Sequence, residues 1–302
     1  MSAVTTLTKR NLRLFLREKR AVFLSFLSAL IVIALYFLFL AKVYKNGMNG
    51  TVDGDAISIA DGAKSFIVYL QMMAGVTILN SMSLAIGAFS VISKDFENKR
   101  IDCLLLTPVR IHETIVSYFA TGFIASFAIN VFAWGLSIAV IGIGTGYWLS
   151  AGSFAYSLFV LFVSSLVSCS FMLLVTVLIK SSSALGVVNG VSGTFFGFLC
   201  GIYIPFDSLG EATKAVGSVL PFSHLTIWLK RVALDDAFGQ VGISGEVKNI
   251  LYRNYFSAEN IGFLSHPAPL RLMVFLSVML GLLCLAVSCI LLNRRIKGQR
   301  NK

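Results

Sequence analysis

The amino-acid sequence predicts an all-α integral membrane protein, and its composition and segment lengths both indicate this fold class. Hydrophobic residues make up 57% of the chain, and charged residues make up 13%, whereas soluble domains carry about 25% charge. A helix needs roughly 20 apolar residues to cross a bilayer. Six segments meet that requirement: residues 21–41, 66–92, 115–143, 154–179, 184–204 and 272–292. They form one transmembrane domain, residues 21–302, and a separate N-terminal helix precedes it.

Basic residues are unevenly distributed among the connecting segments, which predicts the orientation of the chain. With both termini in the cytoplasm, the inner segments hold 16 Lys and Arg but only 5 Asp and Glu. The outer segments then hold 9 of each kind. Because inner loops of membrane proteins are enriched in basic residues, we expect a multi-pass plasma-membrane protein with cytoplasmic N- and C-termini. The net charge of +11 then indicates contact with anionic membrane lipid and not with nucleic acid.

Residues 1–20 predict an amphipathic helix that lies in the inner membrane interface. Successive residues of a helix are about 100° apart, so the side chains can be assigned to faces. One face is basic and carries Lys9, Arg10, Arg13, Arg17 and Arg20. The opposite face is apolar and carries Val4, Leu7, Leu12, Leu14 and Phe15. Such a helix either anchors the chain to lipid or relays motion to the first span. The apolar segment that follows lacks a small-residue cleavage site, so we expect a retained span and not a signal peptide.

A polar stretch, residues 93–114, separates the second and third apolar segments and reads SKDFENKRIDCLLLTPVRIHET. Its four basic and four acidic residues alternate, and a short apolar run follows at residues 104–106. Pro108 lacks an N–H and restricts Thr107, so a helix that starts near Asp95 should end near Thr107. The stretch therefore predicts a short charged helix outside the bilayer, suited to docking on another protein. A solvated connector is the alternative.

Part of this stretch, ENKRIDCLLLTPV, resembles the cytoplasmic loop of type-2 ABC (ABC-2) exporter permeases, which typically reads ERGTLDRLLVTPV. Lys99 stands where that family usually has glycine, and Arg100 where it has threonine. In the family the loop forms a coupling helix that presses on a separate ATP-binding subunit. The resemblance implies that the coupling residues of this chain are Asp95, Glu97, Arg100, Asp102, Leu104, Leu105, Leu106, Thr107 and Pro108.

The resemblance also implies how the whole transporter is organised. We expect two ATP-binding subunits and a second permease chain identical to this one. We expect this chain to bind no cofactor, with ATP and Mg on the partner subunit, since the sequence contains no Gly-x-x-x-x-Gly-Lys-Ser/Thr phosphate-binding loop. The N-terminal helix corresponds to the interface helix of the family. On this interpretation the chain is a transport subunit and not an enzyme.

Glycines and neutral polar residues mark the predicted transport pathway. In the fifth segment, glycines at spacings of 4, 3, 4 and 4 fall on one helical stripe, which lets helices approach closely in lipid. The candidate pathway or packing residues are Gln71, Asn80, Asn189, Gly193, Gly197 and Gly201. For Asn80 and the other neutral polar residues, a hydrogen bond between helices is the preferred interpretation and contact with substrate is the alternative.

The long outer segment, residues 203–271, predicts two helices that resemble the re-entrant helices of the family. Ser208 and Glu211 have the spacing of a capping box, so the first helix should start there and break at Pro221. An amphipathic helix over residues 223–238 should follow. Ser208, Glu211 and Pro221 are therefore the candidate extracellular gate. Residues 240–269 form an extracellular insertion.

The predicted spans contain no Asp, Glu, Lys, Arg or His, which argues against a secondary transporter or ion channel. Gly190-Val191-Ser192-Gly193 matches the Gly-x-Ser-Gly of rhomboid proteases, but no histidine lies in a span to activate the serine. The five cysteines show no metal-binding spacing, so no metal site is expected. We expect an exporter of a hydrophobic or amphiphilic cargo, such as a drug, an antibiotic peptide or a hemolysin-like toxin. Export of lipid-linked glycan or teichoic acid is the alternative.

Overall fold

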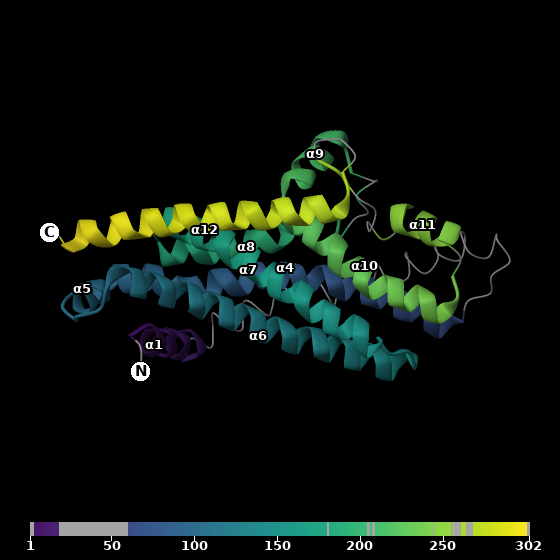
Figure 1. Ribbon diagram of the computed structural model, residues 1–302, viewed down its shortest axis with the longest axis horizontal. Coiled ribbons are helices and arrows are strands. Elements are labelled where there is room, and N and C mark those ends of the chain that lie inside the picture. Colours follow the sequence, from purple (N-terminus) through teal and green to yellow (C-terminus); the bar gives the residue numbers. More distant parts are fainter. Residues whose placement is uncertain are drawn as a thin grey trace.

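The computed structural model describes residues 3–17, 60–179, 181–203, 206, 209–243, 245–254, 256, 261–263 and 268–300. Helices make up the regular structure of these residues (Figure 1). In chain order they are α1 (Ala3–Arg17), α4 (Asp61–Glu97), α5 (Arg100–Leu105), α6 (Ile111–Thr145), α7 (Ala151–Leu178), α8 (Ser182–Leu199), α9 (Glu211–Val219), α10 (Pro221–Val241), α11 (Gly245–Asn254) and α12 (Leu270–Arg300).

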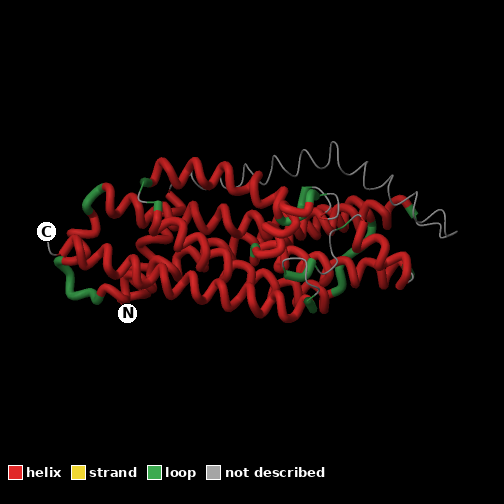
Figure 2. Tube along the Cα trace, turned by 90° about the horizontal axis from the view of Figure 1, so that it is seen from above, coloured by secondary structure: helices red, strands yellow, loops and turns green. Residues whose placement is uncertain are grey.

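Five of the described helices are long and apolar enough to cross a membrane. They are α4, α6, α7, α8 and α12, and they correspond to the second through sixth predicted segments. The long helices run along the long axis of the molecule (Figures 1 and 2). The first predicted segment, residues 21–41, lies outside the described residues.

Helix α4 is the central helix of the bundle, because it packs against α6, α7, α8 and α10 and is buried along almost its whole length. Neutral polar side chains join it to its neighbours. Asn80 Nδ2 donates to Asn130 Oδ1 of α6 at 3.1 Å, and the hydroxyls of Ser81 and Ser168 of α7 lie 2.7 Å apart. The predicted role of Asn80 as a hydrogen-bond partner between helices is therefore confirmed.

Helix α8 ends at Leu199, five residues before the predicted end at 204. The Gly197 carbonyl accepts the backbone N–H groups of Ile202 and Tyr203, which turns the chain back on itself. Gly201 lies in this turn with a φ of 64°, a left-handed conformation that suits glycine. The expectation that Gly201 continues the glycine stripe of the helix is therefore wrong.

The outer segment differs from the prediction in two respects. Helix α9 starts at Glu211 with Gly210 at its N-cap and no side-chain cap, so the predicted capping box is wrong; Ser208 itself lies outside the described residues. The break before Pro221 is confirmed, but Pro221 is the first residue of α10 and not a linker. Helix α10 covers the predicted residues 223–238, and it is buried against α4, α7 and α12 more extensively than an amphipathic pattern predicts.

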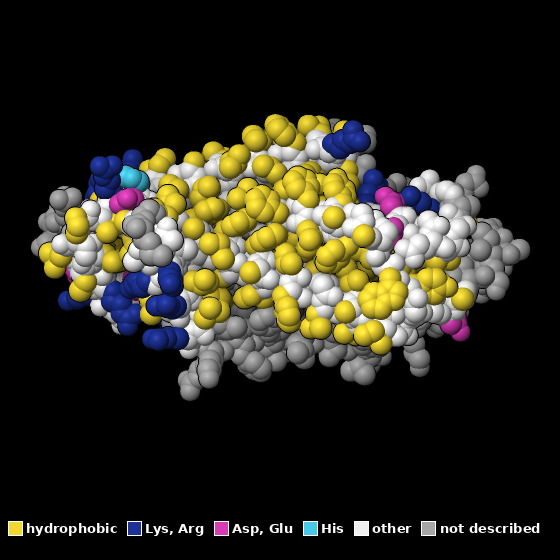
Figure 3. All heavy atoms as spheres, turned by 60° about the horizontal axis from the view of Figure 1, so that its bottom comes forward, with side chains coloured by type: hydrophobic (Ala, Val, Ile, Leu, Met, Phe, Trp, Pro, Cys, Tyr) yellow, Lys and Arg dark blue, Asp and Glu magenta, His cyan; other side chains and the backbone are white. Residues whose placement is uncertain are grey.

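One end of the molecule holds α1, α5 and the carboxyl end of α12, and we call it the terminal end (Figures 1 and 2). Helices α9, α10 and α11 lie toward the opposite end. In the view of Figure 3, hydrophobic side chains cover the middle of the surface, and a dense group of Lys and Arg lies toward the terminal end. This distribution is the one expected for a bundle whose middle faces lipid.

Candidate functional site

The predicted coupling helix is divided between two helices at the terminal end. Helix α4 continues through Asp95 to Glu97, whereas we expected a new helix to begin near Asp95. Asn98 and Lys99 then form a turn in which Lys99 has a φ of 54°. Helix α5 follows, and the turn at residues 106–108 ends it, as the proline predicts. Asp95 and Glu97 therefore belong to α4, whereas Asp102 belongs to α5.

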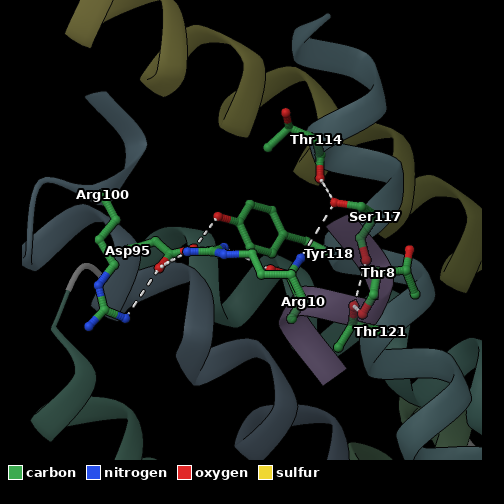
Figure 4. A network of polar contacts seen from close by, with 9 residues as sticks. Thr8, Arg10, Asp95, Arg100, Thr114, Ser117, Tyr118 and Thr121 are labelled. Carbon is green, nitrogen blue, oxygen red and sulfur yellow. Dashed lines mark hydrogen bonds and ion pairs between the residues drawn. The ribbon is translucent and has the colours of Figure 1, made fainter. Parts of the chain in front are cut away.

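Asp95 is the centre of a buried polar network that joins α1, α4 and α6 (Figure 4). Its side chain is 0% exposed. Arg10 of α1 donates to both carboxylate oxygens, at 2.6 and 3.0 Å, and the Tyr118 hydroxyl of α6 donates at 2.7 Å. The Arg100 guanidinium of α5 lies 3.9 Å away. The Asp95 side chain thus has no exposed surface for a partner protein, and its contacts join helices within the chain.

Helix α1 contacts the ends of α4 and α6 through a face that is only partly apolar. Leu7, Asn11 and Phe15, each four residues from the next, are its buried residues. Asn11 Nδ2 donates to Ser117 Oγ at 3.4 Å. Lys9, Arg13 and Arg17 are exposed, as the basic face predicts. Arg10 differs, because its guanidinium turns inward to Asp95.

The charges of the network support one another. Burial of the Arg10 guanidinium would lower its pKa, but the hydrogen bonds and negative charge of Asp95 outweigh that effect and raise the pKa above its ordinary value. Arg10 therefore stays charged at every physiological pH. Removing one partner of a buried ion pair costs about 3–5 kcal/mol of stability. Because the Arg10 side chain is 30% exposed, we expect the loss for this pair to lie toward the lower end of that range.

Glu97 and Phe96 attach the end of α4 to two further helices. The Glu97 carboxylate accepts the backbone N–H of Ser182 at 2.8 Å and its hydroxyl at 2.7 Å, at the start of α8. The Arg295 guanidinium of α12 lies 3.9 Å from the centre of the Phe96 ring. Glu97, predicted as a coupling residue, is exposed but already bonded within the chain.

The remaining coupling residues form the surface of the terminal end. Asp102, Thr107 and Pro108 are exposed, and Leu106 is 89% exposed. Leu104 is half-buried against the core. Leu105 belongs to α5, but the structure describes only its backbone. Leu106 and Asp102 are therefore both accessible at the surface of the terminal end.

The predicted pathway and gate residues do not gather at one place. Gln71 and Asn80 are buried inside the bundle, whereas Asn189 and Gly193 of α8 are partly exposed. Gly197 is buried against the Tyr203 ring. Glu211 and Pro221, the described gate residues, begin α9 and α10 in the opposite half of the molecule. Among the described residues, no cluster of His, Cys, Asp or Glu is suited to a metal ion.

Sequence reasoning missed the internal network because its members lie far apart in the chain. Arg10 and Asp95 are 85 residues apart in the sequence. Tyr118 lies in an apolar segment, where nothing in the local pattern marks its hydroxyl as a buried hydrogen-bond donor. Asp95 carried a signal, since a carboxylate one turn beyond an apolar span is costly unless a cation pairs with it.

Comparison with known proteins agrees with the architecture. No curated protein sequence matches the chain. The family model of the ABC-2 type transporter matches residues 2–232, well over half of the 302 residues. The match includes α1, the network and α5, and it confirms the resemblance drawn from residues 97–109. The chain therefore belongs to the ABC-2 type transporter family.

Proposed function

We propose that this chain is the permease subunit of an ATP-driven exporter and that it couples to ATP through α5 and α1. Membership of the ABC-2 family supports a membrane transport subunit that does no chemistry itself. The observation that carries the coupling proposal is the buried network of Arg10, Asp95 and Tyr118. It joins α1 to the central helix α4 directly beside the exposed α5.

The geometry supports a simple relay. Two copies of an ATP-binding subunit, which hold the ATP and Mg, dock at the cytoplasmic terminal end, one on the α5 of each permease chain. Asp102, Leu106 and Pro108 are the exposed residues that such a subunit meets first. When ATP closes these subunits, α5 is displaced and pushes on the end of α4. Because the Arg10–Asp95 pair resists separation, α1 and α4 move as one body.

We also propose that two identical permease chains form the transport pathway along α8. The outward face of this helix is apolar and open: Val187 is 68% and Val191 60% exposed. A Cβ atom added at Gly186, Gly190 or Gly193 would meet no neighbouring atom of the described residues within 4 Å. A second copy can therefore approach α8 closely.

The apolar face of α8 supports a hydrophobic or amphiphilic cargo. Helix α8 contains no charged residue. After reconstitution in vesicles, ATPase stimulation by amphiphilic peptides and drugs is expected to exceed stimulation by a lipid-linked glycan. The reverse order would identify the glycan exporter instead.

Affinity purification of the tagged chain from its native membrane tests the coupling proposal. We expect an ATP-binding subunit with vanadate-sensitive hydrolysis to co-purify. Leu106→Asp should abolish this co-purification, because it places a charge in the docking surface. Asp95→Asn should retain the subunit but lose roughly 5- to 150-fold in transport per ATP, the range of typical coupling energies.

Arg13→Gln is the matched control, since Arg13 is an exposed cation on the same helix as Arg10. It should leave both assembly and transport unchanged. Full transport by Asp95→Asn would refute the relay through α1. A chain that purifies alone and inert, even after crosslinking from a cysteine at position 106, would refute the exporter itself.

A further inference from the structure

A cleft of about 750 Å³ opens at the terminal end between the start of α6 and the carboxyl end of α12. Its volume lies within the range of about 300–1,000 Å³ found for small-molecule sites. The segment that follows α5, residues 107–110, forms one rim. The cleft is separate from the Asp95 network, since the residues that line it include no member of that network.

The cleft has a basic mouth and apolar walls. Arg110, His112 and Lys297 line it, and all three are exposed. The described residues that line it include no acid, and among the described residues neither His112 nor Lys297 has an acidic partner. Ile115 of α6 and Ile290 of α12 supply apolar surface to the cleft.

The position of these residues relative to the apolar segments identifies the kind of ligand. Ile115 and Ile290 belong to the apolar segments 115–143 and 272–292, whereas Arg110 and Lys297 lie just beyond those segments. The cleft thus crosses the boundary between the hydrocarbon and the headgroup region of a bilayer. A ligand that fits must carry negative charge at one end and hydrocarbon at the other.

We propose that this cleft binds an anionic phospholipid of the inner leaflet, with its phosphate at Arg110 and Lys297. An acyl chain then lies against Val116 and Ile290, both of which are otherwise exposed. The bound lipid links the segment that follows α5 to α12. The leaflet follows from the orientation proposed above, but the binding itself does not depend on the ATP-binding subunit.

Free inorganic phosphate matches the cations but leaves the apolar walls uncovered. A protein partner matches the rim, residues 107–110, but has no access to side chains at hydrocarbon depth. Phospholipid satisfies both parts of the cleft. Each basic residue near an anionic lipid surface contributes about 1 kcal/mol, so loss of both cations is expected to weaken retention about 30-fold.

Native mass spectrometry of the purified full-length chain tests the proposal. The protein is mixed with equal amounts of phosphatidylglycerol and phosphatidylcholine that carry the same acyl chains. We expect the wild type to retain one phosphatidylglycerol per chain in preference to phosphatidylcholine. The double variant Arg110→Gln/Lys297→Gln should lose this preference. The variant keeps the backbone N–H of residue 110 that donates to Glu113, so the start of α6 is preserved.

Arg294→Gln is the matched control. Arg294 is an exposed cation within one turn of Lys297 on α12, but it does not line the cleft. This control variant should retain phosphatidylglycerol like the wild type. Equal retention of the two lipids by the wild type would overturn the proposal, as would unchanged retention by the double variant. Displacement of the lipid by millimolar inorganic phosphate would indicate a phosphate site instead. Loss of the ATP-binding subunit with unchanged lipid retention would indicate a protein-docking surface.

Discussion

At the residue scale, the backbone conformation of Lys99 determines the turn between α4 and α5. Lys99 is the only non-glycine residue with positive φ in the described part of the chain. An L-residue in this conformation costs roughly 1–2 kcal/mol relative to its preferred one. ABC-2 permeases usually have glycine at this position, so the family pattern indicates a turn here that a lysine alone does not indicate.

The stability of variants at Lys99 should therefore differ between glycine, which adopts a positive φ readily, and β-branched residues, which do not. Lys99→Gly is expected to be at least as stable as the wild type, because relief of the left-handed strain offsets the greater freedom of the unfolded chain. Lys99→Val should lose about 1–3 kcal/mol, since a β-branched residue tolerates this conformation poorly. Thermal unfolding in detergent measures both. A valine variant as stable as the glycine variant would contradict the turn geometry.

Lys230 makes a pH-dependent contribution in the opposite half of the molecule. Its buried amine donates to the carbonyls of Gly201 at 3.2 Å and Phe256 at 2.8 Å, which joins α10 to the segments after α8 and α11. Burial lowers the pKa of Lys230 to about 7. The unfolded chain keeps this proton up to a pH of about 10, so it binds more protons than the folded chain above pH 7.

Stability should therefore rise with pH from about 7 to about 10, and Lys230→Met should flatten that rise. Lys230→Met should also lower stability at the upper end by about 1–3 kcal/mol, because two buried carbonyls lose their donor. Unfolding curves in detergent across this pH range measure both effects. A wild-type curve without the rise, or the same rise in the variant, would contradict the assignment.

At the scale of elements, local patterns predicted the helices, and tertiary contacts decided where several of them end. The spans of α4, α6, α7 and α12 follow from apolar length alone, which is a local property. The end of α8 does not, because Cys200 and Ile202 continue the apolar pattern past the turn at Gly201. Helix α10 likewise reads as amphipathic, and only its contacts with three neighbouring helices explain its burial.

The glycines of α8 fall into two kinds that the stripe in the sequence could not distinguish. A Cβ atom at Gly197 would meet the Tyr203 ring at 2.2 Å, whereas one at Gly190 would meet no neighbouring atom of the described residues within 4 Å. Gly197→Ala should therefore destabilise the single chain by about 1–3 kcal/mol through overpacking. Gly190→Leu should fold normally but weaken the contact between two permease chains.

Disulfide crosslinking in native membranes measures that contact. Val187→Cys, on the open face of α8, should form a crosslink between two copies, and Gly190→Leu should reduce it. Val140→Cys is the control, because Val140 is a similarly exposed residue on α6. Equal crosslinking from positions 140 and 187 would place the partner elsewhere.

On the scale of the whole molecule, the functional parts are separated by the length of the bundle. The Asp95 network, α5 and the basic cleft lie at the terminal end, while α9, α10 and α11 lie toward the other. The central helix α4 connects the two halves and contacts α10 as well as α6. In the proposed relay, a displacement at α5 would therefore reach the opposite half through this one buried helix.

This arrangement requires the terminal end to face the cytoplasm, where ATP is, and Cys103 of α5 is a natural reporter of that orientation. Its thiol is exposed, whereas Cys169, Cys200 and Cys284 are buried. A membrane-impermeant maleimide should label Cys103 only after the cells are permeabilised, and Cys103→Ser should remove that label. Asn249→Cys, at an exposed position of α11, should by contrast react in intact cells. Labelling of Cys103 from outside would place α5 beyond the reach of an ATP-binding subunit and would overturn the coupling relay together with the orientation.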